Sequence, residues 1–307
     1  MKLDNITELP SHLRPGCIKT MQAVNPLRER SYYINSPEYW GQPKRDGNRL
    51  IVIATWDKVY YQSRSQKLKR QPCFEINQTL QQAAIASGMF ILDGELYYPS
   101  VTGSEHRTSA QAATINAARG NKTKATPIYA IFKALWFSGR DLTIETEAER
   151  IAAGEKIGKC FRQDFFEVLP TARSQEEKAF LALQQEWEAR EGEIWILKNC
   201  VYKGGKDRHS QAILRTKYGL ELDLIVTDLT LVKGTGRPFS AAIVAEEIED
   251  KLVPRGSVVT GFSFKDMREI IHRHTAKPGT VKITVRCSGL TEKGNLWHGR
   301  FIGLCES

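Results

Sequence analysis

Apolar and polar positions divide the chain into two stretches with different expected structures. In the first, which extends to about residue 219, runs rich in β-branched and aromatic residues predict strands, and apolar residues at helical spacing predict helices. Strands are expected at 50–61 (as a pair), 90–98, 128–137 and 194–197. Helices are expected at 111–118, from near Glu145, and at 175–189. Four prolines interrupt residues 1–38, which we expect to be irregular.

The helix expected at 175–189 has the clearest signals. Ser174, followed three residues later by Glu177, matches a capping box, in which each residue satisfies a backbone N–H of the other. The side predicted to face the core is mostly apolar and consists of Phe180, Leu183, Gln184 and Trp187.

From about residue 220 the pattern changes to short strands separated by turns that contain glycine. The expected strands are 222–226, 241–244, 258–262, 281–287 and 296–304, with a helix at about 265–274. Five short strands in a segment of this length suggest a small β-barrel of the OB type. The predicted fold class is therefore α+β, with a first domain over 1–219 and a second over 220–307.

Composition adds an expectation about partners. Lys and Arg number 44 against 35 Asp and Glu, a net charge of +9, and residues 1–219 carry +8 of it (32 basic minus 24 acidic residues). This excess fits a polyanionic partner such as nucleic acid, or simply a basic soluble surface. No apolar run is long enough for a membrane span, and no secretory signal precedes the chain's first motifs. The six cysteines lack the spacing of a zinc site, so we expect free thiols and a cytoplasmic location.

Four short stretches carry candidate chemistry, and the first is KRDGNR at 44–49, a polar turn ahead of a strand. Lys44 is a candidate nucleophile. A lysine amine is mostly protonated at neutral pH, so it needs neighbouring cations or partial burial to become reactive. Alone, this stretch also fits a solvated basic turn.

The second stretch is LDGEL at 92–96. Alternate residues of a strand share a face, so Asp93 and Glu95 should point the same way. Two carboxylates on one face suit Mg²⁺ or ribose hydroxyls, although a strand edge in water would look the same. Gly94 between them would allow a ligand to approach the backbone closely.

The third and fourth stretches place charges at the ends of apolar strands. Glu193 and Lys198 bracket the apolar residues 194–197 and could both face a pocket. Arg215 and Lys217 share a strand face and could hold a phosphate. Each arrangement also fits ordinary charged strand ends.

Taken together and in this order, the four stretches resemble the covalent nucleotidyltransferases, and over about residues 38–307 the chain is similar to ATP-dependent DNA ligases of the small, two-domain type. The segments 129–142 and 259–270 support the resemblance. It implies a nucleotidyltransferase (adenylation) domain of antiparallel sheets with flanking helices, followed by an OB-fold domain.

The resemblance also implies roles for individual residues. Lys44 would attack the α-phosphate of ATP and carry AMP, with Asp46 as a second catalytic residue. Glu95 and Glu193 would hold Mg²⁺ or Mn²⁺, and Phe132 would stack on adenine. The residues implied to bind ATP are Gln42, Lys44, Arg49, Arg64, Glu95, Phe132, Lys198, Arg215 and Lys217.

The sequence departs from the family pattern at several positions. Gln42 replaces a glutamate, Arg215 replaces the first of two lysines, and Lys133 replaces an aspartate. Glu191 can be aligned in place of Glu193 as the metal-site acid. The basic motif that often ends the family's chains is missing, and Arg300 is its candidate substitute.

The implied function is a monomeric ligase that seals nicks in duplex DNA during replication, repair or recombination. Its steps are formation of lysyl-AMP, transfer of AMP to the 5′-phosphate, and closure by the 3′-hydroxyl. The basic segments 64–70, 119–124 and 203–208 are candidate phosphate contacts. The alternatives within the superfamily are an RNA ligase and a GTP-using mRNA capping enzyme. The non-enzyme alternative is a basic, OB-containing DNA-binding protein.

Overall fold

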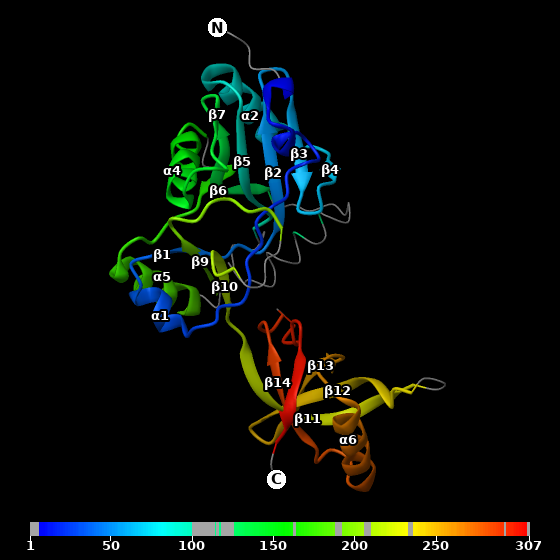
Figure 1. Cartoon of the computed structure of the whole chain (residues 1–307). Helices are drawn as coiled ribbons and strands as arrows, with labels where there is room; N and C mark the ends of the chain where they lie inside the picture. Colours follow the sequence, from blue (N-terminus) through cyan, green and yellow to red (C-terminus); the bar gives the residue numbers. More distant parts are fainter. Residues whose placement is uncertain are drawn as a thin grey trace. The chain divides into compact units, whose positions relative to one another are not determined.

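The chain folds as two compact units, which comprise residues up to Lys217 and residues from Tyr218 (Figure 1). The computed structural model describes residues 6–99, 114, 117, 126–161, 164–187, 192–205, 210–232, 236–291 and 293–305. In this part of the chain no helix is long and apolar enough to cross a membrane.

The first unit contains a large sheet whose neighbouring strands are antiparallel, except that β8 runs parallel to β6. Within the described residues its order is β4-β3-β2-β5-β6-β7, with β8 also beside β6. The strands are β2 (Asn48–Ala54), β3 (Val59–Ser63), β4 (Leu68–Lys69), β5 (Phe90–Tyr97), β6 (Ile128–Phe137), β7 (Arg140–Asp141) and β8 (Phe166–Val168).

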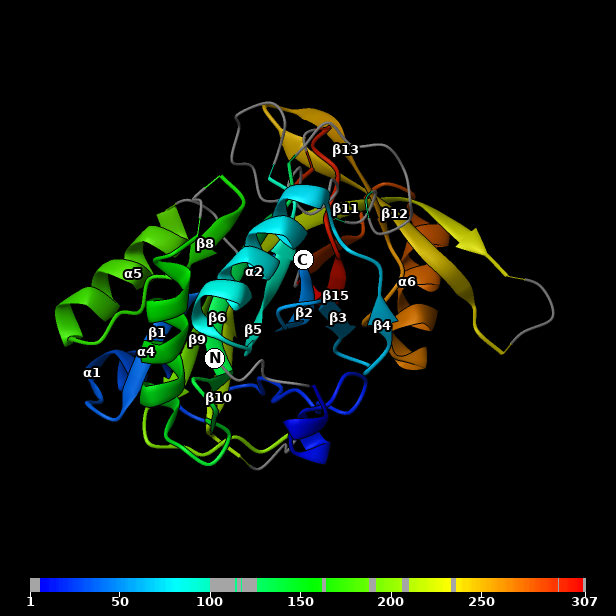
Figure 2. The same ribbon diagram turned by 90° about the horizontal axis from the view of Figure 1, so that it is seen from above.

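Both faces of this sheet are covered, which explains why its central strands are apolar at consecutive positions. Successive side chains of a strand point to opposite faces. Val52 packs in the core under α2 (Phe74–Ser87) and α4 (Glu147–Gly158), which lie over one face (Figure 2). Ile51 and Ile53 pack on the other face against the N-terminal segment, which contains the short 3₁₀ turns η1 (Ile6–Glu8) and η2 (Ser11–Leu13).

A smaller antiparallel sheet of the first unit has the order β1-β9-β10. Its strands are β1 (Tyr39–Pro43), β9 (Gly192–Leu197) and β10 (Ile213–Lys217), and the helices beside it are α1 (Arg30–Asn35) and α5 (Gln175–Trp187). The core on the helix-covered face contains Tyr33 of α1 and Trp195 of β9, whose rings stack with centroids 6.2 Å apart. Residues 1–38 were expected to be irregular, and the described part of this segment, 6–38, contains one α-helix and two 3₁₀ turns.

The capping box predicted for α5 is present, but its predicted core face is wrong. Phe180 and Leu183 are 68% and 66% exposed. The buried side instead includes Lys178 and Leu181. The Lys178 amine donates to the carbonyl oxygens of Tyr33 (3.2 Å) and Ser36 (2.5 Å), so hydrogen bonds to the end of α1 keep a lysine on the buried side. The Trp187 side chain lies outside the described residues.

The second unit is a five-stranded antiparallel sheet with one helix, which fits the predicted OB-type domain. Among the described residues its order is β13-β12-β11-β14-β15. The elements are β11 (Leu220–Leu231), β12 (Phe239–Ile248), β13 (Lys251–Val258), α6 (Phe264–Ala276), β14 (Lys282–Cys287) and β15 (Arg300–Leu304). Met267 and Ile270 of α6 pack into the core with Phe239. The predicted α+β class is confirmed.

Two strand predictions in the second unit were displaced. The strand expected at 258–262 is the preceding segment β13, which ends at Val258. This strand contains Pro254 and Gly256, and the φ of Gly256 is +91°. The register of β13 with β12 shifts at these residues. Because proline and glycine are uncommon inside strands, the sequence pattern did not predict a strand here. The strand expected at 296–304 begins only at Arg300. The helix expected at 111–118 lies almost wholly outside the described residues.

Gly94, at the centre of β5, generates a first testable prediction. A Cβ atom here would overlap the Ala130 carbonyl oxygen and lie 2.7 Å from Cζ of Tyr129. We expect Gly94→Ala to lower the unfolding free energy of the first unit by about 1–3 kcal/mol, the usual cost of overpacking, measured by chemical denaturation. Gly303→Ala in β15 is the control, because among the described residues a Cβ at this position meets no atom within 4 Å. Equal stability losses in the two variants would contradict this account.

Candidate functional site

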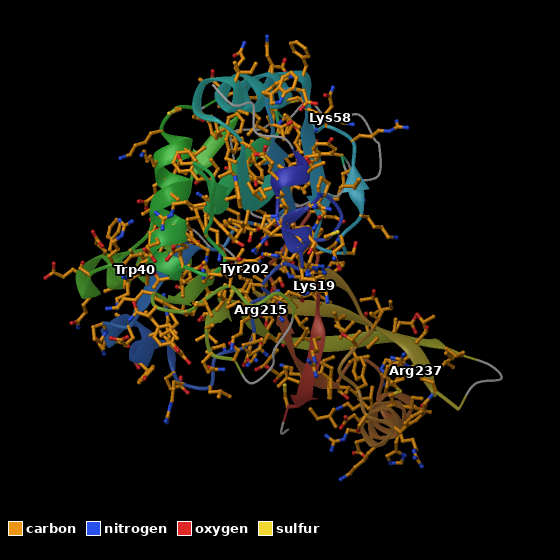
Figure 3. The ribbon with its side chains drawn as sticks, turned by 45° about the horizontal axis from the view of Figure 1, so that its top comes forward. Lys19, Trp40, Lys58, Tyr202, Arg215 and Arg237 are labelled. Carbon is orange, nitrogen blue, oxygen red and sulfur yellow. The ribbon has the colours of Figure 1, made fainter. Side chains whose placement is uncertain are left out.

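A cavity of about 1220 Å³ lies in the first unit and is lined by side chains from both of its sheets. The large sheet contributes Arg49 from β2, Glu95 from β5 and Phe132 from β6. The small sheet contributes Ile194 from β9 and Arg215 from β10. Figure 3 labels Arg215 on its strand and Tyr202 on the chain beyond β9. The N-terminal segment 20–23 forms another part of the wall.

The structure brings most of the predicted site residues to this cavity. The predicted residues that line it are Gln42, Lys44, Arg49, Arg64, Glu95, Phe132, Arg215 and Lys217. Asp46 is adjacent, with Oδ1 3.3 Å from the Lys44 Nζ. Glu193 and Lys198 are not among the described residues that line the cavity.

Lys44 directly follows β1, and backbone contacts hold it at the cavity. Its N–H donates to the Gly192 carbonyl at the start of β9 (3.0 Å). Its side chain is 19% exposed. Gly47 allows the turn to pass close to β5, because a Cβ here would lie 2.9 Å from Glu95 Cγ. The KRDG turn therefore packs against the acidic strand and places Lys44 and Glu95 at the same cavity.

A buried ion pair joins β2 to β5 beside Lys44. Arg49 Nε and Nη2 donate to the two carboxylate oxygens of Asp93, each at 2.5 Å, and Asp93 is fully buried. The Arg49 guanidinium lies 4.7 Å from the centre of the Phe132 ring. Burial alone would lower the pKa of Arg49, but the charge and hydrogen bonds of Asp93 raise it above its usual value. The guanidinium therefore stays charged.

Glu95 is the acidic residue among the described residues that line the cavity. Burial raises its pKa to about 7, and Asp93 acts in the same direction, while Arg49, Lys44 and a hydrogen bond from the Gly47 backbone oppose the rise. A carboxylate with this pKa gains its charge near neutral pH. The described residues contain no group of three or more His, Cys, Asp or Glu arranged to hold a metal ion, so Glu95 would need ligands from elsewhere.

Basic side chains line the cavity from two directions. Arg64 directly follows β3, Lys69 is the last residue of β4, and Arg70 follows it. Arg215 and Lys217 come from β10. Converging cations of this kind suit the charge of phosphate groups. Of the segments expected to contact phosphates, 64–70 therefore contributes to the cavity, 119–124 lies outside the described residues, and 203–208 is described only to Gly205.

Glu193 does not face the cavity, and this corrects an expectation. Ile194 and Ile196 line the cavity, so the alternating side chains of Glu193 and Trp195 point to the opposite face of β9. The Glu193 carboxylate is fully buried and accepts a hydrogen bond from Arg30 Nη2 at 2.9 Å. The alternative acid, Glu191, lies outside the described residues.

Lys198 also does not line the cavity. Its Nζ donates to the Pro37 carbonyl oxygen at 3.0 Å and lies 3.8 Å from Glu38 Oε1. Because Lys198 follows the last residue of β9, it stands at the end of the strand opposite to Gly192. Lys198 therefore tethers the chain that enters β1, and the expectation that it and Glu193 share a pocket is wrong.

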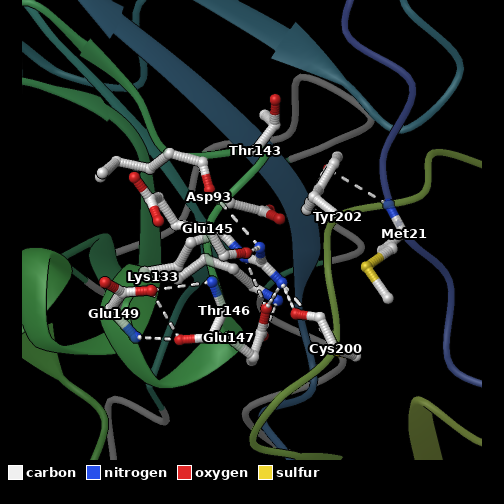
Figure 4. A network of polar contacts seen from close by, with 12 residues as sticks. Met21, Asp93, Lys133, Thr143, Glu145, Thr146, Glu147, Glu149, Cys200 and Tyr202 are labelled. Atoms are coloured by element: carbon white, nitrogen blue, oxygen red, sulfur yellow. Dashed lines mark hydrogen bonds and ion pairs between the residues drawn. The ribbon is translucent and has the colours of Figure 1, made fainter.

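Sequence reasoning missed a buried ionic network that includes Lys133, the residue after Phe132 in β6 (Figure 4). Lys133, which also lines the cavity, pairs with Glu147, and Glu147 pairs with Arg150 at 2.7 and 2.5 Å. Burial alone would raise the pKa of Glu147, but the two cations lower it. Arg150 also donates to the Cys200 carbonyl (2.9 Å). The network thus ties β6 to α4 and to the chain beyond β9.

Tyr202 extends this network to the cavity wall. Its ring centre lies 5.9 Å from Lys133 Nζ and 5.6 Å from Arg150 Cζ. Its hydroxyl accepts a hydrogen bond from the Met21 N–H at 3.1 Å, and Met21 lines the cavity. The one sequence signal for this network was Lys133, noted as a departure from the family pattern. Nothing in the sequence indicated Glu147, Arg150 or Tyr202.

Glu95 generates a prediction about stability and pH. Between its ordinary pKa of 4.5 and its folded value of about 7, the folded chain binds a proton that the unfolded chain does not. Stability therefore falls as pH rises through this window. We expect Glu95→Gln, which cannot ionise, to gain stability relative to the parent over the same window, by on the order of 3 kcal/mol. Thermal unfolding of both proteins, without nucleotide and with a metal chelator, measures this gain. If the stability difference between Glu95→Gln and the parent stays the same from pH 4.5 to 8, the raised pKa of Glu95 is contradicted.

A family model and several solved structures match this chain. The family model described as "ATP dependent DNA ligase domain" matches residues 22–217. No curated protein matches the sequence. Among solved structures, mycobacterial DNA ligase D complexed with ATP and MES has a TM-score of 0.54 and 17% identity, covering 94% of this chain and 95% of that chain.

Two further structures show the same fold. A structure from a study of DNA binding with a minimal scaffold by Lig E DNA ligases has a TM-score of 0.59 and 17% identity, covering 93% of this chain and 100% of that chain. The ATP-dependent DNA ligase from bacteriophage T7, in complex with ATP, has a TM-score of 0.50 and 16% identity, covering 94% of this chain and 98% of that chain.

Proposed function

This chain belongs to the family of ATP-dependent DNA ligases, and we propose that it seals nicks in duplex DNA through an AMP adduct on Lys44. The observation that carries the proposal is the position of Lys44 at a cavity shared by Glu95, Arg215 and Lys217. A single cavity thus combines an amine, a carboxylate and the cations that a phosphoryl transfer requires.

In the first proposed step, Nζ of Lys44 attacks the α-phosphorus of ATP. The phosphorus–nitrogen bond forms as the bond to the pyrophosphate oxygen breaks, and pyrophosphate leaves. The attacking amine must lose its protons, and Asp46 Oδ1, 3.3 Å away, is placed to accept one. Arg64, Arg215 and Lys217 would stabilise the charge on the phosphate oxygens.

In the second step, an oxygen of the 5′-phosphate at the nick attacks the phosphorus of the adduct. The phosphorus–nitrogen bond to Lys44 breaks, the lysine amine is regenerated, and AMP is joined to the DNA end. In the third step, the 3′-hydroxyl attacks that 5′-phosphate, AMP leaves, and the phosphodiester bond is complete. The hydroxyl proton is released, and none of the three steps needs an oxidant or a reductant.

The nucleoside part of ATP would lie deeper in the cavity. Because Arg49 covers one face of the Phe132 ring, we propose that adenine stacks on the other face. Stacking of a base on an aromatic ring contributes about 1–3 kcal/mol. Arg49 and Glu95 would contact the ribose, and Gln42 would contact the edge of the base.

The carboxylate of Glu95 fits a magnesium or manganese ion. Mg²⁺ is usually bound by one or two carboxylates together with substrate phosphates, and Glu95 offers one hard oxygen ligand beside the proposed phosphate site. The ion would supply positive charge to the phosphate oxygens. We do not assign Glu193 to it, because that carboxylate lies on the other face of β9 and pairs with Arg30. The cytoplasmic location and the monomeric state expected from the sequence stay predictions.

The central prediction concerns nick sealing. With a nicked, 5′-phosphorylated DNA duplex, ATP and Mg²⁺, we expect Lys44→Ala to lower the rate of sealing by at least about 1,000-fold. Without the covalent nucleophile, only the part of the rate enhancement that comes from substrate binding remains. Lys58→Ala removes an exposed lysine whose amine lies over Tyr60. Lys58 is not among the described residues that line the cavity, so this variant should leave sealing unchanged. Product on a denaturing gel is the measurement.

The same assay separates the alternatives. Unchanged sealing by Lys44→Ala would exclude this nucleophile. Absence of sealing by the parent protein, with DNA binding retained, would favour the non-enzyme alternative. A nicked RNA duplex sealed faster than the DNA duplex would favour an RNA ligase.

A further inference from the structure

Gln42 and Thr171 form a hydrogen-bonded pair at the wall of the cavity. Gln42 lines the cavity, is 3% exposed, and donates from Nε2 to Thr171 Oγ1 at 3.0 Å. Thr171 is held beside β1 because the next residue, Ala172, exchanges two backbone hydrogen bonds with Gly41, at 2.8 and 2.9 Å. The two side chains are thus positioned by the backbone before any ligand binds.

The residues next to Gln42 leave its side-chain amide as the group that would hydrogen-bond to a ligand at this part of the cavity wall. Ile194 lies opposite Gln42 in the strand register, and Leu169 also lines the cavity; both are apolar. Pro43 has no N–H to donate. The N–H of Gly41 donates to Ala172, and the N–H of Lys44 donates to Gly192. The backbone N–H groups on either side of Gln42 are therefore engaged or missing.

The position of Gln42 relative to Lys44 suits contact with a nucleobase. Alternate residues along an extended chain share a face and are separated by roughly 7 Å. A nucleotide whose α-phosphate lies at Lys44 can therefore place the edge of its base at Gln42, which lines the same cavity. This step rests on the proposed function.

The Gln42–Thr171 pair can offer a ligand either a hydrogen-bond acceptor or a hydrogen-bond donor. A glutamine amide has a carbonyl acceptor and an NH₂ donor, and a threonine hydroxyl both donates and accepts. When Nε2 donates to Thr171, the oxygen Oε1 is left for a ligand. When the amide turns over, the Thr171 hydroxyl donates to Oε1, and Nε2 is left for a ligand. Both orientations keep one hydrogen bond within the pair, so neither has a large advantage.

We propose that the Gln42–Thr171 pair lets this enzyme use either purine nucleoside triphosphate, ATP or GTP, to load Lys44. With adenine, Oε1 accepts a hydrogen bond from the exocyclic amine. With guanine, the amide turns over and Nε2 donates to the carbonyl oxygen at the same position. The covalent step is the same for both: the bond from Nζ to the α-phosphorus forms, and pyrophosphate leaves. A carboxylate at position 42 would accept only and would reject guanine.

The experiment measures the rate of nucleotide adduct formation on Lys44 by mass spectrometry, with the full chain, Mg²⁺, and ATP or GTP in separate reactions. For the parent protein we expect the GTP rate to be within about tenfold of the ATP rate. A site whose hydrogen-bonding group could only accept, or only donate, would discriminate between the two nucleotides by roughly 10⁴-fold. Gln42→Glu should lower the GTP-to-ATP ratio by at least about tenfold.

Thr171 is tested by a matched pair of variants. Thr171→Val removes the hydroxyl that supports both amide orientations, so it should slow both reactions by a similar factor and change the ratio by less than about threefold. Thr171→Ser keeps the hydroxyl and should restore both rates. An ATP adduct on each variant shows that it is folded.

Two results would overturn the inference while leaving the proposed function intact. One is an ATP adduct on Lys44 of the parent protein with a GTP rate lower by 1,000-fold or more. The other is a GTP-to-ATP ratio that Gln42→Glu leaves unchanged. If neither nucleotide forms an adduct on Lys44, the proposed function itself fails.

Discussion

The buried ion pair between Arg49 and Asp93 is the interaction on which the cavity depends. Asp93 is fully buried, and both of its carboxylate oxygens accept hydrogen bonds from one guanidinium. A buried charge without its partner costs about 3–5 kcal/mol, so neither residue can be removed alone without a large penalty. The pair fixes the Arg49 guanidinium against Phe132, and the charge of Arg49 opposes the rise that burial imposes on the pKa of Glu95.

The cavity exists because two sheets of the first unit contribute different chemistry to it. The large sheet supplies the Arg49–Asp93 pair, Glu95 and Phe132, while the small sheet supplies Lys44 at the end of β1 and the cations of β10. The buried network of Lys133, Glu147 and Arg150 connects β6 to α4. Buried ion pairs are thus formed by Arg49 and by Lys133, two cations of the large sheet that line the cavity.

Much of the fold followed from local pattern. Strands β2, β5 and β6 contain runs of consecutive apolar residues, because both faces of the large sheet are covered, and their positions were predicted closely. Helix α5 shows where pattern fails: Lys178 is buried through hydrogen bonds to two carbonyl groups of another element, and no periodicity in hydropathy contains that information. In β13, Pro254 and Gly256 masked a strand that is held by its neighbour β12.

The candidate site was predictable where spacing alone decides which way a side chain points. Asp93 and Glu95, two residues apart on one strand, both lie beside Arg49, as alternation requires. Glu193 was misplaced because its assignment depended on which residue of β9 faces inward, and the structure turns Ile194 toward the cavity instead. Glu147 could not be anticipated, because its role comes from a contact with Lys133, a residue of another element.

The central claim is that Lys44 is the residue that captures the nucleotide, and the most direct measurement maps the site of attachment. The purified full chain is exposed to ATP and Mg²⁺, digested, and its peptides are examined by tandem mass spectrometry. The account predicts one AMP per chain, joined to Nζ of Lys44 by a bond that acid cleaves and that added pyrophosphate reverses. AMP on another residue of the cavity, such as Lys217 or Lys133, or no covalent AMP in a protein that seals nicks, would contradict it.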